Sequence, residues 1–327
     1  MLADGLVVAA GLLVLVAGGE LLVRGAVGLA YLLRISPAVI GLTIVAFATS
    51  MPELVVSVVA AIRGSPDLAI GNVMGSNIFN VGFVLGVTAL FVALPVPAKS
   101  LMLEWPFLLA ATLLTLGIMA NGLLGRVEGG ILLLLLVAFV WVLVRASRKE
   151  VRESEAQGLT VVAATFRRTA INGAFLAGGL GLLLLGAHWV VQGATSIALD
   201  LGISERVVGL TVVAMGTSLP ELASSLVAAV RGRTDIAVGN VIGSCIFNLF
   251  GIFGVGALLS PMVVNPAFFE AHGLRSVGDA WWMLFFTLLL APLVLFGKRQ
   301  VGRGDGVILV AAFSVYMVQL VLQGGGS

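Results

Sequence analysis

Two glutamates lie within long apolar stretches of the chain. Glu53 and Glu221 fall near the middle of the segments 37–62 and 205–230, each of which is long and apolar enough to cross a membrane. A carboxylate at bilayer depth costs about 2.5–3.5 kcal/mol on insertion scales, so such residues usually serve a function. We expect these two carboxylates to bind a cation.

The alternative is that each glutamate is buried for structural reasons, either protonated or paired with an arginine. Arg24 is available for one of them, although Glu20, four residues earlier, competes for it. In the second half of the chain the position equivalent to Arg24 is Gln192, so the other glutamate lacks this partner.

Proline precedes both glutamates, at Pro52 and Pro220. Because proline has no N–H and its ring clashes with the carbonyl four residues back, the carbonyls of 46–49 and 214–217 leave the helix ladder. Hydroxyl groups three and four residues before each glutamate share its helix face. These are Thr49 and Ser50 in the first segment and Thr217 and Ser218 in the second. Oxygen ligands of these kinds suit hard cations such as Ca²⁺ and Na⁺.

The segments 67–93 and 235–260 add a second set of polar residues. In each segment a serine and an asparagine lie four residues apart on one face, and we interpret them as further ligands. They are Ser76 and Asn80, and Ser244 and Asn248. Asn72 and Asn240 extend the same faces. For these two, cation binding and hydrogen bonding between helices are both consistent with the sequence.

The chain contains an internal repeat. At a shift of 168 residues, 37–80 aligns with 205–248 without a gap, and 27 of the 44 pairs are identical. GLTIVAFATSMPEL becomes GLTVVAMGTSLPEL, and GNVMGSNIFN becomes GNVIGSCIFN. Five spans separate the two copies, so we expect them to face opposite ways across the membrane. Such inverted repeats are typical of transporters whose site lies at their interface.

Composition agrees with a membrane protein. Apolar residues make up 60% of the chain and charged residues 10%, whereas a soluble domain has about 25% charged residues. A net charge of +2 gives no reason to expect a nucleic-acid partner, and one cysteine excludes an internal disulfide. We predict an all-α membrane fold of ten helices as two inverted five-helix repeats. The predicted spans are 5–33, 37–62, 67–93, 100–121, 127–145, 170–199, 205–230, 235–260, 279–297 and 305–323.

Loop charges predict the orientation. With the N-terminus outside, inward loops hold 13 Lys and Arg residues and outward loops hold 4, so both termini should lie outside the cell membrane. The predicted domains are a first repeat at 1–145, a cytoplasmic linker at 146–168 and a second repeat at 169–327.

The paired motifs resemble the α-repeats of the Ca²⁺/cation antiporter superfamily, in particular its sodium/calcium exchanger branch. The resemblance covers essentially the whole chain. It implies a Ca²⁺ site bridged by Glu53 and Glu221 with the carbonyls of Thr49 and Thr217. It also implies Na⁺ sites formed by Ala46, Ser50 and Ser76 and by Ala214, Ser218 and Ser244, with Asn80 and Asn248 completing the ring.

Some relatives have aspartate in place of Asn248, and in the potassium-dependent branch that acid is tied to K⁺ binding. The resemblance therefore implies a K⁺-independent antiporter that exchanges Na⁺ for Ca²⁺, with no cofactor and no obligate protein partner. A proton/Ca²⁺ antiporter of the same superfamily is the nearest alternative, and a cation channel is another. An intramembrane enzyme is disfavoured because the sequence has no HExxH motif and no Ser–His pair at depth.

For the transport cycle, we expect the spans 5–33 and 170–199 to slide past the other spans.

Overall fold

The computed structural model describes residues 1–96, 100–156, 166–203, 208–270, 277–297 and 299–324. Within them the chain is mostly helical. The first half contains, in order, α1 (Leu2–Leu33), α2 (Pro37–Ile40), η1 (Gly41–Val45), α3 (Ala46–Thr49), α4 (Met51–Ile62), α5 (Pro66–Phe79), η2 (Asn80–Leu85), α6 (Gly86–Phe91), β1 (Leu94–Pro95), η3 (Ser100–Glu104), α7 (Trp105–Met119), β2 (Leu123–Leu124) and α8 (Arg126–Ala156).

The second half repeats this order closely. It contains α9 (Phe166–Asp200), η4 (Gly209–Val213), α11 (Ala214–Gly216), α12 (Leu219–Val230), α13 (Thr234–Ile246), η5 (Phe247–Ile252), α14 (Phe253–Leu259), β3 (Met262–Val263), η6 (Pro266–Phe268), α15 (Asp279–Phe296), β4 (Gln300–Val301) and α16 (Arg303–Gly324). The segments η1 to η5 are π-helical and η6 is a 3₁₀ turn.

Eight helical runs in the described residues are long and apolar enough to cross a membrane, and a ninth span is a pair of helices bent by 48°. The bent pair is Pro37–Thr49 with Met51–Ile62. The tenth predicted span, 205–230, starts within residues that are not described, and its remainder contains α12, which is shorter than a full span. The chain is thus a membrane-type helical protein with eight or nine described spans.

The predicted linker is partly helical. α8 continues without a break from the expected span at 127–145 to Ala156, and α9 starts at Phe166. The charged sequence after Arg145 allows this because Arg, Lys and Glu are good helix formers. At residue 145 the sequence changes from apolar to charged, but the helix does not end there.

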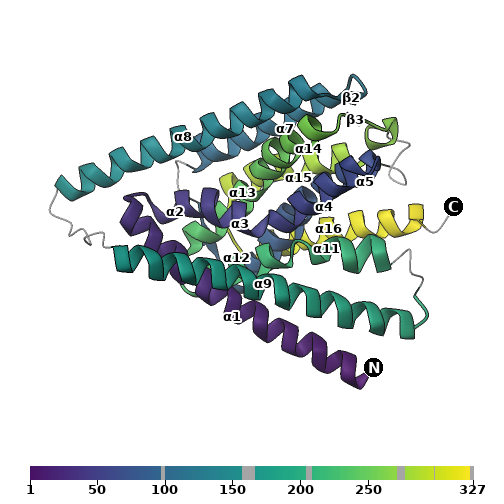
Figure 1. The fold of residues 1–327 in the computed structure, drawn as a ribbon, viewed down its shortest axis with the longest axis horizontal. Coiled ribbons are helices and arrows are strands. Elements are labelled where there is room, and N and C mark those ends of the chain that lie inside the picture. The colour runs from purple at the N-terminus through teal and green to yellow at the C-terminus, as the bar shows by residue number, and fades with distance from the viewer. Residues whose placement is uncertain (97–99, 157–165, 204–207, 271–276, 298, 325–327) are drawn as a thin grey trace.

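Helices α1 and α9 lie side by side along one flank of the molecule, whereas the shorter helices gather in its centre (Figure 1). Glycines let the two flanking backbones approach closely. A Cβ at Gly18 would lie only 2.9 Å from the carbonyl oxygen of Gly179. Small residues at a helix–helix contact permit this packing within a membrane.

The two halves also pack against each other away from α1 and α9. α8 of the first half packs against α14 of the second, and α16 of the second packs against α6 of the first. Two short antiparallel ladders do the same, with β1 pairing β4 and β2 pairing β3. The core formed between the halves is apolar and includes the fully buried rings of Phe250, Phe253 and Phe286.

Candidate cation site

Both glutamates follow a break in their helix. α3 ends at Thr49 and α4 starts at Met51, so Glu53 lies in the first turn of a new helix. In the second half Thr217 and Ser218 separate α11 from α12, which places Glu221 in the same position. The prolines account for the breaks, because Pro52 and Pro220 cannot donate to the carbonyls four residues earlier.

The two breaks are joined by a reciprocal pair of hydrogen bonds. The hydroxyl of Ser50 donates to Oε1 of Glu221 at 2.8 Å, and the hydroxyl of Ser218 donates to Oε1 of Glu53 at 2.7 Å. All four side chains are buried. Each carboxylate is therefore held by the helix break that carries the other carboxylate, and residues 168 positions apart meet at one place.

Buried polar atoms without a hydrogen-bond partner gather among the predicted ligands. Eight such side-chain atoms occur in the described residues, and six belong to residues that the sequence assigned to the site. These six are Oε2 of Glu53, Oε2 of Glu221, Oγ of Ser244, Oδ1 of Asn248 and both amide atoms of Asn80. Because an unpaired buried polar atom is costly, such a cluster indicates a ligand that completes it. Five of the six are oxygens, the ligand atoms of hard cations.

The serines and asparagines of the second set differ in their contacts. Ser76 lies 3.5 Å from the hydroxyl of Ser218, so it adjoins the site directly. Asn248 is buried and its Nδ2 donates to Oδ1 of Asn77 at 3.0 Å. Asn80 and Ser244 are buried at the first turn of η2 and near the end of α13.

The backbone ligands implied by the resemblance have different surroundings in the two halves. The carbonyl of Ala46 accepts from the N–H of Ser50 at 3.0 Å, so it stays in the helix ladder, contrary to the expectation from the sequence. In the second half the N–H of Ser218 donates to Met215 instead, at 3.1 Å, so this bond does not engage the carbonyl of Ala214. The hydroxyl of Thr49 donates to the carbonyl of Val45 at 3.1 Å, and Thr217 lies in the corresponding turn.

Asn72 and Asn240, for which the sequence left two roles open, brace the helices that carry the glutamates. Nδ2 of Asn72 donates to the backbone carbonyl of Glu53 at 3.3 Å and to Ser57 at 2.8 Å. Asn240 makes the equivalent bonds to the carbonyl of Glu221 and to a serine hydroxyl. Their amide groups are used between helices, which agrees with hydrogen bonding.

Sequence reasoning missed Asn77, which contacts Asn248. Its signal was available, because Asn77 is one of two positions that differ between GNVMGSNIFN and GNVIGSCIFN. Its counterpart in the second half, Cys245, is also buried.

Comparison with known proteins agrees with this geometry. A family model described as sodium/calcium exchanger protein matches residues 5–145 and again 172–322. The chain belongs to the sodium/calcium exchanger family. The sodium/calcium exchanger MaX1 of Methanosarcina acetivorans is 32% identical, over 96% of this chain and 97% of that protein. The inner membrane protein YrbG of Escherichia coli is 35% identical, over 95% of this chain and 94% of that protein.

The fold also matches solved structures of the family. The sodium-calcium exchanger NCX_Mj soaked with zero Na⁺ and Ca²⁺ gives a TM-score of 0.80 at 29% identity, over 98% of this chain and 100% of that chain. NCX_Mj soaked with 10 mM Na⁺ and 10 mM Sr²⁺ gives 0.79 at 30% identity, over 97% and 99%. The arrangement of helices in this exchanger-family chain is therefore that of a sodium-calcium exchanger.

A cavity adjoins one of the predicted ligands in this family member. It has a volume of about 60 Å³ and lies between α5, α11 and α16. Its lining includes Gly75, Ser76, Met215, Phe313 and Tyr316. A Cβ at Gly75 would meet no atom of the described residues within 4 Å. At the equivalent Gly243 a Cβ would collide with the backbone carbonyl of Leu42, because α13 packs directly against η1 there.

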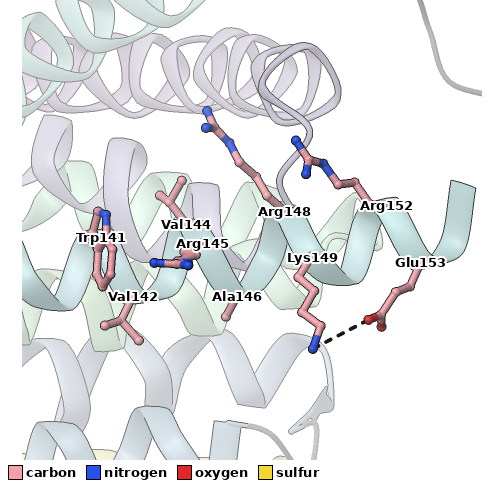
Figure 2. A pocket seen from close by; sticks show the side chains of 9 residues that line it. All are labelled: Trp141, Val142, Val144, Arg145, Ala146, Arg148, Lys149, Arg152 and Glu153. Atoms are coloured by element: carbon pink, nitrogen blue, oxygen red, sulfur yellow. Dashed lines mark ion pairs between the residues drawn. The ribbon is translucent and has the colours of Figure 1, made fainter.

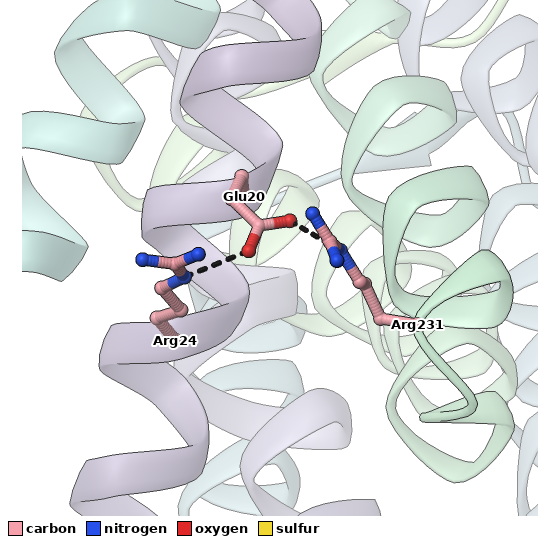
Figure 3. Close-up of polar contacts among 3 residues, drawn as sticks. All are labelled: Glu20, Arg24 and Arg231. Atoms are coloured by element: carbon pink, nitrogen blue, oxygen red, sulfur yellow. Dashed lines mark hydrogen bonds and ion pairs between the residues drawn. The ribbon is translucent and has the colours of Figure 1, made fainter.

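Arg24 does not pair with either buried glutamate. Its Nε donates to Glu20 at 2.7 Å, and Glu20 also accepts from Nε of Arg231 at 2.7 Å (Figure 3). Of the two possible partners that the sequence offered for Arg24, a buried glutamate or Glu20, the structure shows Glu20. Because Arg231 follows the end of α12, this cluster links α1 to the helix that carries Glu221.

Proposed function

We propose that the chain is a secondary antiporter that exchanges Na⁺ for Ca²⁺ across the cell membrane by alternating access. The observation that carries the proposal is the reciprocal bonding of Ser50 to Glu221 and Ser218 to Glu53. It leaves one oxygen of each carboxylate without a partner among the described residues. Two facing carboxylates balance the charge of one Ca²⁺, and exclusive occupancy by Ca²⁺ or Na⁺ couples the two flows.

The proposed ligands are the twelve residues that the sequence and the resemblance indicated. Glu53 and Glu221 hold Ca²⁺ together with the carbonyls of Thr49 and Thr217. Hydroxyl, amide and carbonyl oxygens of the others hold Na⁺ and complete the ring. These others are Ala46, Ala214, Ser50, Ser218, Ser76, Ser244, Asn80 and Asn248. The unpartnered buried atoms support this set, because five of the twelve residues contribute an oxygen to them: Glu53, Glu221, Asn80, Ser244 and Asn248.

We further propose ten spans in two inverted repeats, with domains at 1–145 and 169–327 joined by a linker at 146–168. Reciprocal contacts between the halves support the repeats, as do the two separate matches of the family model. Alternating access is supported by the cavity beside Gly75 and the tight contact at Gly243, because equivalent positions of the two copies differ in openness.

The proposed orientation places both termini outside. The end of α8 supports it, because Arg145, Arg148, Lys149 and Arg152 line a surface pocket there (Figure 2). They extend the helix beyond Trp141, whose ring lies 5.0 Å from the guanidinium of Arg145. Aromatic residues favour the membrane interface and basic residues the cytoplasmic side. Four of the basic residues counted from the sequence, Lys99, Arg206, Arg275 and Lys298, lie outside the described residues.

Ca²⁺ uptake into proteoliposomes tests the function. Vesicles loaded with Na⁺, K⁺ or a proton excess are diluted into Ca²⁺, and radiolabelled uptake is followed. Uptake driven by Na⁺ alone supports the proposal. Uptake driven by protons and not by Na⁺ would identify a proton/Ca²⁺ antiporter. Uptake that needs no outward gradient of another ion, and follows the Ca²⁺ gradient alone, would identify a channel.

A further inference from the structure

Asn77 connects a predicted ligand to the backbone of the other half. It is buried near the end of α5, directly after Ser76. Its Nδ2 donates to the backbone carbonyl of Cys245 at 3.3 Å. Its Oδ1 accepts from Nδ2 of Asn248 at 3.0 Å. Asn77 is therefore the middle of a chain of hydrogen bonds that ends at the candidate site.

The polarity of this chain is fixed at its far end. A backbone carbonyl only accepts hydrogen bonds, so Asn77 must turn its NH₂ group toward Cys245. The amide oxygen of Asn77 then faces Asn248, and Asn248 must in turn present its own NH₂ group to it. The oxygen of Asn248 is left pointing elsewhere, and it is one of the buried oxygens without a partner. A cation is bound by an amide oxygen and repelled by an NH₂ group.

We propose that Asn77 is a positioning residue, which fixes the amide of Asn248 with its oxygen toward the transported cation. The inference rests on the proposed function, because it assigns a role within the same site. Without Asn77 the amide of Asn248 can rotate by half a turn and present NH₂ to the ion. Only the molecules whose Asn248 oxygen faces the ion then bind it well, so the apparent affinity for the cation falls in proportion to that fraction. The remaining ligands stay in place.

The second half lacks this arrangement. The position equivalent to Asn77 is Cys245, and a thiol is a weak hydrogen-bonding group. The thiol of Cys245 lies 3.9 Å from the backbone carbonyl of Asn77. Asn80, the counterpart of Asn248, meets the thiol of Cys245 in place of a second amide. Because a thiol is a weak hydrogen-bonding group, the two asparagines are unequal ligands, one with a fixed orientation and one without, despite the similarity of their motifs.

The test is Asn77→Cys, which gives the first half the residue that the second half already contains at this buried position. In proteoliposomes we expect the half-saturating concentrations of Ca²⁺ and Na⁺ to rise roughly threefold to tenfold, the effect of one lost hydrogen bond. The maximal rate should change less than twofold. Ser314→Ala is the control, because that hydroxyl donates to the carbonyl of Val310 on its own helix, and its affinities should match those of the parent. Cys245→Ala is a comparison variant that keeps the backbone carbonyl to which Asn77 donates. Asn77→Ala serves as a second variant.

A double-mutant cycle separates positioning from packing. In an Asn248→Asp background the side chain presents an oxygen in either orientation, so Asn77→Cys should change Ca²⁺ affinity, measured by calorimetry, less than twofold. An equal loss in both backgrounds means that Asn77 acts through packing, and it overturns the proposal. So does an unchanged affinity in the parent background. Failure of the proposed function itself is recognised separately, by Ca²⁺ exchange that persists in Glu53→Gln.

Discussion

The hydroxyl of Ser50 donates a hydrogen bond of 2.8 Å to Glu221, a residue 171 positions later in the chain. Ser218 bonds Glu53 in the same way. Each half of the molecule thus positions the carboxylate of the other half, and neither half can form the site alone. This relationship sets the expected behaviour of the variants below.

Neutralising either glutamate should abolish Ca²⁺ exchange. Glu53→Gln and Glu221→Gln each remove one of two negative charges and one oxygen that Ca²⁺ would otherwise contact. We expect less than about 1% of the parent rate of radiolabelled Ca²⁺ uptake, the effect of roughly 3 kcal/mol. Both proteins should elute from a sizing column as the parent does. Asp235→Asn, at the first turn of α13, is the control with an acid outside the site. Parent-like uptake in either glutamine variant would contradict the two-carboxylate site.

Removing the serine hydroxyls should weaken binding without abolishing it. Ser50→Ala and Ser218→Ala each delete a hydrogen bond to a buried carboxylate, and such bonds contribute about 1.5–3 kcal/mol. We expect the half-saturating Ca²⁺ concentration to rise by roughly tenfold to a hundredfold in each case, and by similar amounts because the bonds are reciprocal. Ser314→Ala is the control, since that hydroxyl bonds only its own helix at Val310. A large effect in one serine variant and none in the other would argue against the reciprocal arrangement.

Transport should not require K⁺. Asn248 supplies a neutral amide, so the proposed ligands include two carboxylates and no third negative charge. Na⁺-driven Ca²⁺ uptake should be unchanged within about twofold when choline replaces K⁺ on both sides. Asn248→Asp should alter the dependence on Na⁺, K⁺ or protons. A collapse of the parent flux in choline would refute K⁺ independence.

The ion cluster of Glu20 should bias the molecule toward the conformation seen here. Glu20 bonds Arg24 on its own helix and Arg231 beyond α12, and these groups are partly exposed, so each pair contributes about 0.2–1 kcal/mol. Met317 also lines the cavity beside Gly75. In Glu20→Gln, the cysteine of Met317→Cys should react with an impermeant thiol reagent roughly twofold to fivefold more slowly. The measurement uses the Cys245→Ala background.

Arg63→Gln is the matched control for the Glu20 cluster. Arg63 is the counterpart of Arg231, but His188 stands where an equivalent of Glu20 would be. The labelling rate in this variant should equal that of the parent. Equal rates in Glu20→Gln and Arg63→Gln would show that the cluster does not hold this conformation.

The sequence by itself determined which residues are polar at bilayer depth and which of them share a helix face. Those features depend only on composition and on the helical period. They identified Glu53, Ser50, Ser76 and their counterparts, because the repeat places each polar residue in two apolar segments. The prolines likewise predicted the breaks, which fall at Ser50 and at Thr217 and Ser218, since a missing N–H acts locally.

Only the tertiary structure decided which polar groups meet. Helical periodicity indicated Glu20 as a partner for Arg24 four residues away, but it says nothing about contacts between distant segments, so the second partner of Glu20, Arg231, could not be predicted. The same holds for Asn77, whose role arises because its amide reaches the carbonyl of Cys245 in the other half. Burial then makes such contacts specific, since a polar atom removed from water needs a partner from whichever helix packs against it.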